Sequence, residues 1–165
     1  MVKKIIAALV AIVIIAGLYF VIFHKSDKDR VKRQLALLSD YASKYPGEGA
    51  AVMLMKTQAV GGLFDEHCGL EVGDDFFSGD YTPEEISSKS VMMRRQFSNA
   101  LISFYDINVD FPEKDKALVT LTARFTGVVS GGETVNQVRE LQVTLNRKNG
   151  KWLFAEFKIV TVLKK

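Results

Sequence analysis

The sequence predicts an α+β fold, with helices in the first half of the chain and antiparallel strands in the second. Residues 117–129 carry this prediction best, because apolar side chains alternate there with Thr and Arg, as in a strand with one buried face. Two further runs follow at 134–147 and 152–163, and the Asn149-Gly150 pair between them is typical of a tight hairpin turn. We therefore expect three successive strands that fold back on one another, with the earlier segments covering them.

The first two expected helices lie between the apolar amino terminus and the middle of the chain. The first begins near Ser26 and ends before Pro46, with apolar residues at helical spacing on one face. The second begins near Glu48. The run Met53-Leu54-Met55 within it indicates burial on more than one side or a pocket wall.

A third helix is expected from Thr82, and a strand follows it. Thr82 is suited to cap the helix, Pro83 fits its first turn, and the glutamates after them lie at the positive end of the helix dipole. Alternation over residues 104–111 then predicts a strand that leads into the sheet. The residues on its expected apolar face are Tyr105, Ile107, Val109 and Phe111.

Charge and cysteine content exclude several classes of function. The chain has 22 Lys and Arg and 19 Asp and Glu, and two of the lysines precede the first apolar run, so the remainder is close to neutral. This balance leaves no basic footprint for nucleic acid, and no such partner is expected. Cys68 is the only cysteine, which rules out an intrachain disulfide and a Cys-based metal site. We interpret it as a small buried hydrophobe, with an intermolecular disulfide as the alternative.

The amino terminus is predicted to span a membrane. Residues 5–23 contain no charged side chain, and a helix of this length would cover roughly 28 Å, close to the hydrocarbon thickness of a bilayer. A cleaved signal peptide is the alternative. Because the run ends in the bulky residues 18–23, which do not suit a cleavage site, we prefer an uncleaved single-span anchor.

The expected organisation is a short basic terminus at 1–4, the anchor at 5–23, a juxtamembrane linker at 24–30 and one domain at 31–165. A literal count of positive charges on the two sides of the span would place the domain in the cytoplasm. The Met-Val-Lys-Lys start before an apolar core has instead the form of an export signal. We expect a single-pass protein of a bacterial-type cytoplasmic membrane, with its domain outside the cytoplasm.

Three segments of the domain carry a resemblance to a known superfamily. They are Leu63-Phe64-Asp65, the helix start from Gly79 to Ile86, and Gly150-Lys151-Trp152 in the hairpin. With these segments in this order, the chain from about residue 27 to 163 resembles the nuclear transport factor 2-like superfamily, which includes ketosteroid isomerases and relatives of polyketide cyclases. The resemblance implies a cone of about three helices on a curved antiparallel sheet. It implies no single chemistry, since members include enzymes, ligand binders and interaction modules.

The resemblance also directs attention to carboxylates inside the cone, because enzymes of this superfamily set a carboxylate base opposite hydroxyl or carboxyl donors. The candidates are Glu156, Asp65 and His67. Glu156 is the most suggestive, because its strand face is expected to include Trp152. Structural roles are the alternative: an ion pair of Glu156 with Lys158, and a surface or capping position for His67. No residue is assigned as catalytic, and no metal or cofactor is expected.

Side chains expected to contact a ligand in the cone are Tyr41, Tyr45, Met55, Arg124 and Glu156. Arg124 is an anion-binding residue or, alternatively, a residue on the solvated face of the sheet. In the run 134–147 the apolar phase shifts at Arg139 and Glu140, which predicts a β-bulge there.

Three functions are compatible with the sequence. The first is a membrane-tethered, non-catalytic binding module that recognises a small apolar ligand, a peptide or a protein partner at the membrane surface. The second is an isomerase- or lyase-type enzyme acting on a hydrophobic small molecule, with Glu156 or Asp65 as base. The third is a scaffold component of a cell-envelope assembly. A homodimer through the open sheet face is expected as well.

Overall fold

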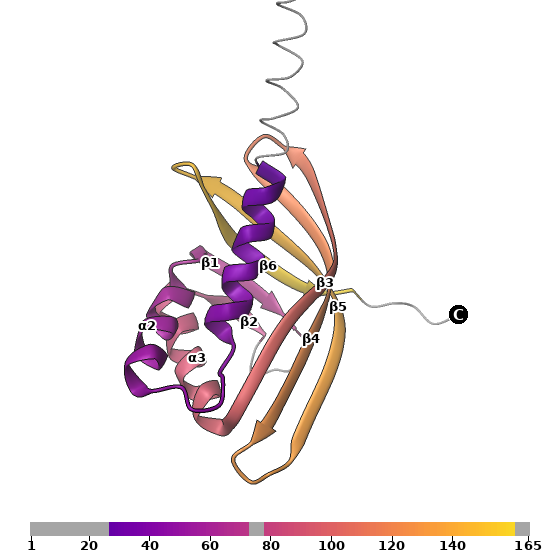
Figure 1. Ribbon diagram of the computed structural model, residues 1–165. Coiled ribbons are helices and arrows are strands. Elements are labelled where there is room, and N and C mark those ends of the chain that lie inside the picture. Colours follow the sequence, from indigo (N-terminus) through magenta and orange to yellow (C-terminus); the bar gives the residue numbers. More distant parts are fainter. Residues whose placement is uncertain (1–26, 73–77, 161–165) are drawn as a thin grey trace, which may run out of the picture.

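The structure is a computed structural model of the 165-residue chain and describes residues 27–72 and 78–160. Helices cover one side of a curved six-stranded sheet (Figure 1), which agrees with the predicted α+β cone. No helix within the described ranges is long and apolar enough to cross a bilayer. The predicted anchor at 5–23 lies outside the described residues.

The six strands have the spatial order β2-β1-β6-β5-β4-β3. All neighbours are antiparallel except β1 and β6, which run parallel. Asn149 and Gly150 both have positive φ, as a type I′ turn between β5 and β6 requires. In chain order the strands are β1 (Phe64–Glu71), β2 (Gly79–Tyr81), β3 (Phe97–Glu113), β4 (Lys116–Val129), β5 (Thr134–Lys148) and β6 (Lys151–Ile159).

Three helices are described: residues 27–42, α2 (Ala50–Gly61) and α3 (Pro83–Gln96). The predicted cap of α3 is confirmed, because the Thr82 hydroxyl accepts from the Glu85 amide while the Glu85 carboxylate accepts from the Thr82 amide. Helices α2 and α3 approach closely at Gly61, where a Cβ atom would lie 2.6 Å from the Pro83 carbonyl oxygen. A larger residue there would push the two helices apart.

The core lies between the helices and the inner face of the sheet. Val31 and Leu35 of the first helix pack with Trp152 and Phe154 of β6, and all four are almost completely buried. Cys68 is fully buried in β1, which agrees with its interpretation as a small hydrophobe. Burial raises the pKa of its thiol to about 12, so the thiol is un-ionised at neutral pH.

A β-bulge in β6 changes which of its side chains face the core. The extra residue is Ala155, because Phe154 and Glu156 pair with consecutive residues of β5. The alternation restarts there, so Phe157 joins Phe154 in the core while Glu156 turns to the outer face. The predicted shared face of Glu156 and Trp152 is therefore wrong.

A second bulge, in β3, moves Tyr105 out of the core. Asp106 has a φ of 53° and lies where the pairing with β4 shifts by one residue. Tyr105 is 50% exposed whereas Val109 is 5% exposed, so the two do not share a face as predicted. The bulge predicted at Arg139 and Glu140 is also wrong, because β5 pairs with β4 in one unbroken register.

Candidate ligand-binding cavity

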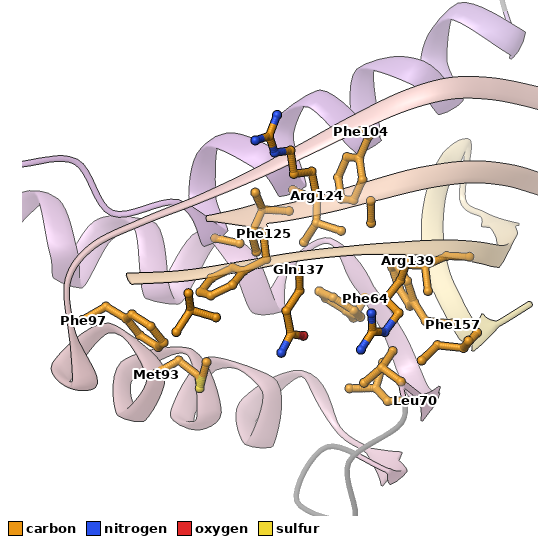
Figure 2. A pocket seen from close by; sticks show the side chains of 18 residues that line it. Phe64, Leu70, Met93, Phe97, Phe104, Arg124, Phe125, Gln137, Arg139 and Phe157 are labelled. Carbon is orange, nitrogen blue, oxygen red and sulfur yellow. The ribbon is translucent and has the colours of Figure 1, made fainter. Parts of the chain in front are cut away.

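An open cavity of about 480 Å³ lies between the helices and the inner face of the sheet (Figure 2). The residues that enclose it come from the first helix, α3 and strands β1 and β3 to β6, so most elements of the fold contribute to one site. Its wall is mainly apolar and rich in phenylalanine. The larger apolar side chains in the wall include Phe64, Leu70, Met93, Phe97, Phe125 and Phe157.

Two polar side chains of β5 belong to the same wall. Gln137 pairs across the sheet with Phe125, and Arg139 pairs with Ala123, which places all four on the inner face. Figure 2 shows the Gln137 and Arg139 side chains extending from β5 to the side on which Leu70 lies. Both are exposed to solvent, so they mark the mouth of the cavity.

Within residues 27–72 and 78–160, most N–H donors of the Arg139 guanidinium have no protein acceptor. One terminal nitrogen donates to the carbonyl oxygen of the adjacent Val138 at 3.0 Å. No carboxylate among the described residues lies within ion-pair distance of Arg139, although ion pairs form elsewhere on the molecule. A guanidinium presents five N–H donors in a fixed plane, which suits a carboxylate or another planar acceptor.

A second lobe of about 240 Å³ continues the cavity toward α2 and α3. The two lobes share walls that include Leu38, Phe64 and Phe97, and the second lobe extends to Val60 and Ile86. Almost all of this extension is apolar. The combined space therefore suits an elongated molecule with its polar end at the mouth and its apolar end between the helices.

The described wall of both lobes lacks groups that titrate near neutral pH. It contains no Asp, Glu, His, Cys or Tyr, and its ionisable side chains are arginines and one lysine, Lys89. A general base of ordinary type therefore does not line the described cavity. The arrangement can bind and orient an acidic group, and it can stabilise negative charge near Arg139.

Asp65 lies at the start of β1 and is buried, but outside the cavity wall. Its carboxylate accepts from the Lys148 ammonium at 2.6 Å, the Asn146 amide at 3.1 Å and the Glu66 backbone N–H at 2.8 Å. Burial alone would raise the pKa of Asp65, but these donors outweigh it and hold the pKa below its ordinary value. Asp65 is placed as an ionised structural carboxylate.

Glu156 also lies away from the cavity, on the outer face of β6. One of its oxygens is 2.9 Å from the Lys158 ammonium, and the other lies 3.5 Å from the Thr144 hydroxyl. The glutamate side chain is 40% exposed, so the ion pair is open to solvent. The ion pair with Lys158 is the structural role that the sequence offered for Glu156 as the alternative to catalysis.

His67 lies on the solvent side of β1. Its side chain is 72% exposed, and its Nδ1 is 3.8 Å from a carboxylate oxygen of Asp80 in the neighbouring strand β2. Within residues 27–72 and 78–160, no group of three or more His, Cys, Asp or Glu side chains is placed to hold a metal ion.

The structure does not bring the other predicted ligand contacts together. Tyr41 packs against the core without lining the cavity, and Tyr45 is exposed with the Lys56 ammonium 4.6 Å above its ring. Met55 is 60% exposed on the outer side of α2, so the predicted pocket wall there is wrong. Arg124 borders the cavity, but Figure 2 shows its guanidinium pointing away from Gln137 and toward the other face.

A buried ionic cluster supports the helices next to the cavity. Arg94 of α3 donates to the Glu48 carboxylate and to the carbonyl oxygens that end the first helix, including that of Ser43 at 2.8 Å. The Lys56 ammonium is 3.3 Å from the other Glu48 oxygen. Burial alone would raise the pKa of Glu48, but Arg94 and Lys56 outweigh it and lower the pKa. The cluster fixes the relative positions of three helices.

Gln137 and Arg139 were missed as ligand contacts, although the sequence contains a signal for them. Odd-numbered residues of β5 occupy the inner face from Val135 to Leu145. Gln137 and Arg139 are polar and interrupt the apolar series, and such an interruption resembles the change of phase that a bulge produces. Strict alternation through the interruption would have placed both on the inner face.

Comparison with known proteins identifies the fold but no close relative. No known family profile matches the sequence, and no curated protein matches it. A hexachlorocyclohexane dehydrochlorinase, LinA-type3 from Novosphingobium barchaimii, has a similar structure, with a TM-score of 0.65, 10% identity, and coverage of 83% of this chain and 87% of that chain. The Kfla4162 protein of Kribbella flavida has a TM-score of 0.68 with 10% identity, covering 83% and 91%.

A protein of unknown function from Mycobacterium tuberculosis is similar as well, with a TM-score of 0.61, 14% identity, and coverage of 81% of this chain and 75% of that chain. Identities this low show the fold alone, and the fold carries both enzymes and proteins without a known activity. The described part of this chain has the nuclear transport factor 2-like fold, as its sequence motifs predicted.

Proposed function

We propose that the cone binds a hydrophobic small molecule that carries one acidic or hydrogen-bond-accepting group. The observation that carries this proposal is the pairing of a mainly apolar cavity of about 480 Å³ with a guanidinium, Arg139, at its mouth. Such a volume lies in the range of small-molecule sites, which are mostly apolar with a few polar groups that fix orientation. The ligand's apolar part enters between the helices while its polar end meets Arg139 and Gln137.

Photo-labelling of the full-length protein tests this proposal without requiring a natural ligand. The probe is a long-chain fatty acid with a diazirine in its chain, and its methyl ester serves as the uncharged comparison. We expect peptides that contain Met93 and residues 135–141 to be labelled. Arg139→Gln should reduce labelling by the acid about tenfold or more, the size expected for a hydrogen bond to a charged group, and should leave labelling by the ester unchanged.

Two further variants complete the test. Ala123→Phe should reduce labelling by both probes, because the larger side chain occupies the cavity. Lys158→Gln removes a cation from the outer face and should change neither. Labelling that maps outside the cavity, or that is equal in all variants, would contradict the proposal.

A lyase- or isomerase-type enzyme on the same scaffold is the second candidate. What favours it is the dehydrochlorinase among the proteins of similar structure, whose named substrate is a hydrophobic small molecule. What opposes it is the described cavity wall, which has no carboxylate, imidazole or phenol. Asp65→Asn and Glu156→Gln test this candidate: loss of turnover in either folded variant would favour the enzyme, and full turnover in both would exclude these residues as its base.

We retain the proposal that residues 5–23 tether this cone to a cytoplasmic membrane with the domain on its outer side. Its support is the length and apolar character of the run and the form of the residues before it. A tether would concentrate the cone near ligands that partition into the bilayer. The homodimer through the outer sheet face and the envelope-assembly role stay predictions.

A further inference from the structure

A second pocket, of about 310 Å³, lies at the end of the molecule where the first helix begins. Figure 1 shows this end of the helix beside the β5–β6 hairpin. The Gln34 side chain donates to the Trp152 carbonyl oxygen, so the helix and β6 that form the pocket are joined. Three of its lining residues are cationic and exposed, Arg30, Arg33 and Lys151, and none is acidic.

Three carboxylates at this end, those of Asp27, Asp115 and Asp65, have other partners. The Arg147 guanidinium forms ion pairs with the carboxylates of Asp27 at 2.9 Å and Asp115 at 3.2 Å. The Lys148 ammonium forms an ion pair with the buried Asp65. Arg30 has only a distant contact, at 3.9 Å, with Asp27. Within the described residues, neither Arg33 nor Lys151 has a carboxylate at ion-pair distance. The pocket therefore offers positive charge for an external anion.

Chain geometry places this pocket close to the predicted membrane span. The apolar run ends at Phe23, and four residue steps separate it from Asp27. Since a fully extended chain advances at most about 3.5 Å per residue, Asp27 lies within about 14 Å of Phe23 however the intervening residues are arranged. The headgroup layer of a bilayer has a thickness of several ångströms beyond its hydrocarbon. The segment between the span and Asp27 is therefore short enough for Arg30 and Arg33 to reach lipid phosphates when this end of the first helix faces the bilayer.

We propose that the pocket formed by Arg30, Arg33 and Lys151 binds the phosphate headgroup of an anionic phospholipid and docks this end of the cone on the membrane. Arginine forks and lysine ammonium groups both bind phosphate well. Each basic residue at an anionic membrane surface contributes about fivefold to the docked population. Docking fixes the orientation of the cone relative to the bilayer. The proposal rests on the predicted span and is independent of the cavity's ligand.

Hydrogen exchange of the full-length protein in lipid nanodiscs tests the proposal. Discs of phosphatidylcholine alone are compared with discs that also contain phosphatidylglycerol. We expect backbone amides of residues 27–35 and 148–153 to exchange at least about fivefold more slowly in the anionic discs. The double variant Arg33→Gln with Lys151→Gln should lose this difference. The matched variant Arg95→Gln with Lys158→Gln removes the same charge elsewhere and should keep it.

Several outcomes would overturn the proposal. If the full-length chain fails to enter discs, residues 5–23 do not hold the pocket near a bilayer. Equal exchange in both kinds of disc would exclude binding of an anionic headgroup. If both double variants lose the difference in exchange equally, the protein is attracted to the anionic membrane by its overall charge and not through this pocket. Inorganic phosphate that slows exchange as strongly in phosphatidylcholine discs would indicate a soluble anion. Photo-labelling of the cavity is read at other residues, so failure here is distinguishable from failure of the proposed function.

Discussion

The Asp65 carboxylate is the most strongly constrained acid outside the ionic cluster of the helices. It is 4% exposed, and it accepts from an ammonium group, a side-chain amide and a backbone N–H. A buried charge of this kind persists because its hydrogen bonds are complete, and it stiffens the start of β1 rather than serving as a base. Its chemistry is therefore that of a structural anchor.

Replacing Asp65 should expose this role in a pH-dependent way. The folded pKa lies below the ordinary 3.8, so the carboxylate stabilises the fold above about pH 4 and loses this contribution as pH falls through the folded value. We expect Asp65→Asn to lower the free energy of unfolding by about 1–2 kcal/mol at pH 7, with the deficit shrinking toward pH 3. Urea unfolding at both pH values measures it.

Glu66→Gln is the matched control, because Glu66 is 84% exposed and should change little at either pH. A deficit in Asp65→Asn that stays the same from pH 7 to pH 3 would contradict the structural role assigned to the carboxylate.

Helix α3 is the element that joins the cone's helices, and Arg94 is the residue through which it does so. Arg94 is 2% exposed and binds both Glu48 and the last carbonyl oxygens of the first helix. Arg94→Met should cost about 3–5 kcal/mol of unfolding free energy, because it leaves the buried Glu48 carboxylate without its main partner. Arg95→Met, at the exposed neighbour, should cost far less.

Denaturant unfolding of the two single variants and of the pair Glu48→Gln with Arg94→Met measures this coupling. The pair should be more stable than Arg94→Met alone, since the uncompensated charge is gone. Equal losses in Arg94→Met and Arg95→Met would show that the cluster does not hold the helices together.

At the same scale, the bulges explain which predictions from the sequence failed. Alternation predicted the strands and the Asn149-Gly150 turn, and cap chemistry predicted the start of α3. A bulge leaves no such trace, because the one extra residue, Ala155 in β6, is an ordinary small side chain. Glu156 was therefore assigned to the wrong face. Arg139 was missed for the opposite reason: β5 has no bulge, but polar residues on its inner face suggested one.

At the scale of the whole molecule, the fold of the described residues was accessible from the sequence, while the pocket was not. The order of helices and strands and three short motifs predicted the cone, which the structure and its structural neighbours bear out. The cavity depends on gaps between side chains from five strands and two helices. Periodicity assigns each residue to a face, but it carries no information on how well opposite faces fill the space between them.

The orientation of the whole molecule is testable by a fusion to its carboxyl end. Bacterial alkaline phosphatase needs disulfides that form only outside the cytoplasm, so we expect a fusion after Lys165 to be active if the domain lies there. A reporter that is active only inside the cytoplasm, fused at the same position, is the reciprocal control. An inactive phosphatase with an active cytoplasmic reporter would reverse the proposed orientation.

The parallel pairing of β1 with β6 has a consequence for biosynthesis. Phe64 pairs with Phe154, which the ribosome adds ninety residues later. At about 5–20 residues per second, β1 waits roughly 5–20 s for this partner. Strand β6 also lies in the middle of the sheet, between β1 and β5. A chain cut short before Lys151 would therefore be left with two disconnected pieces of sheet, whose unpaired edges favour aggregation until β6 has been made.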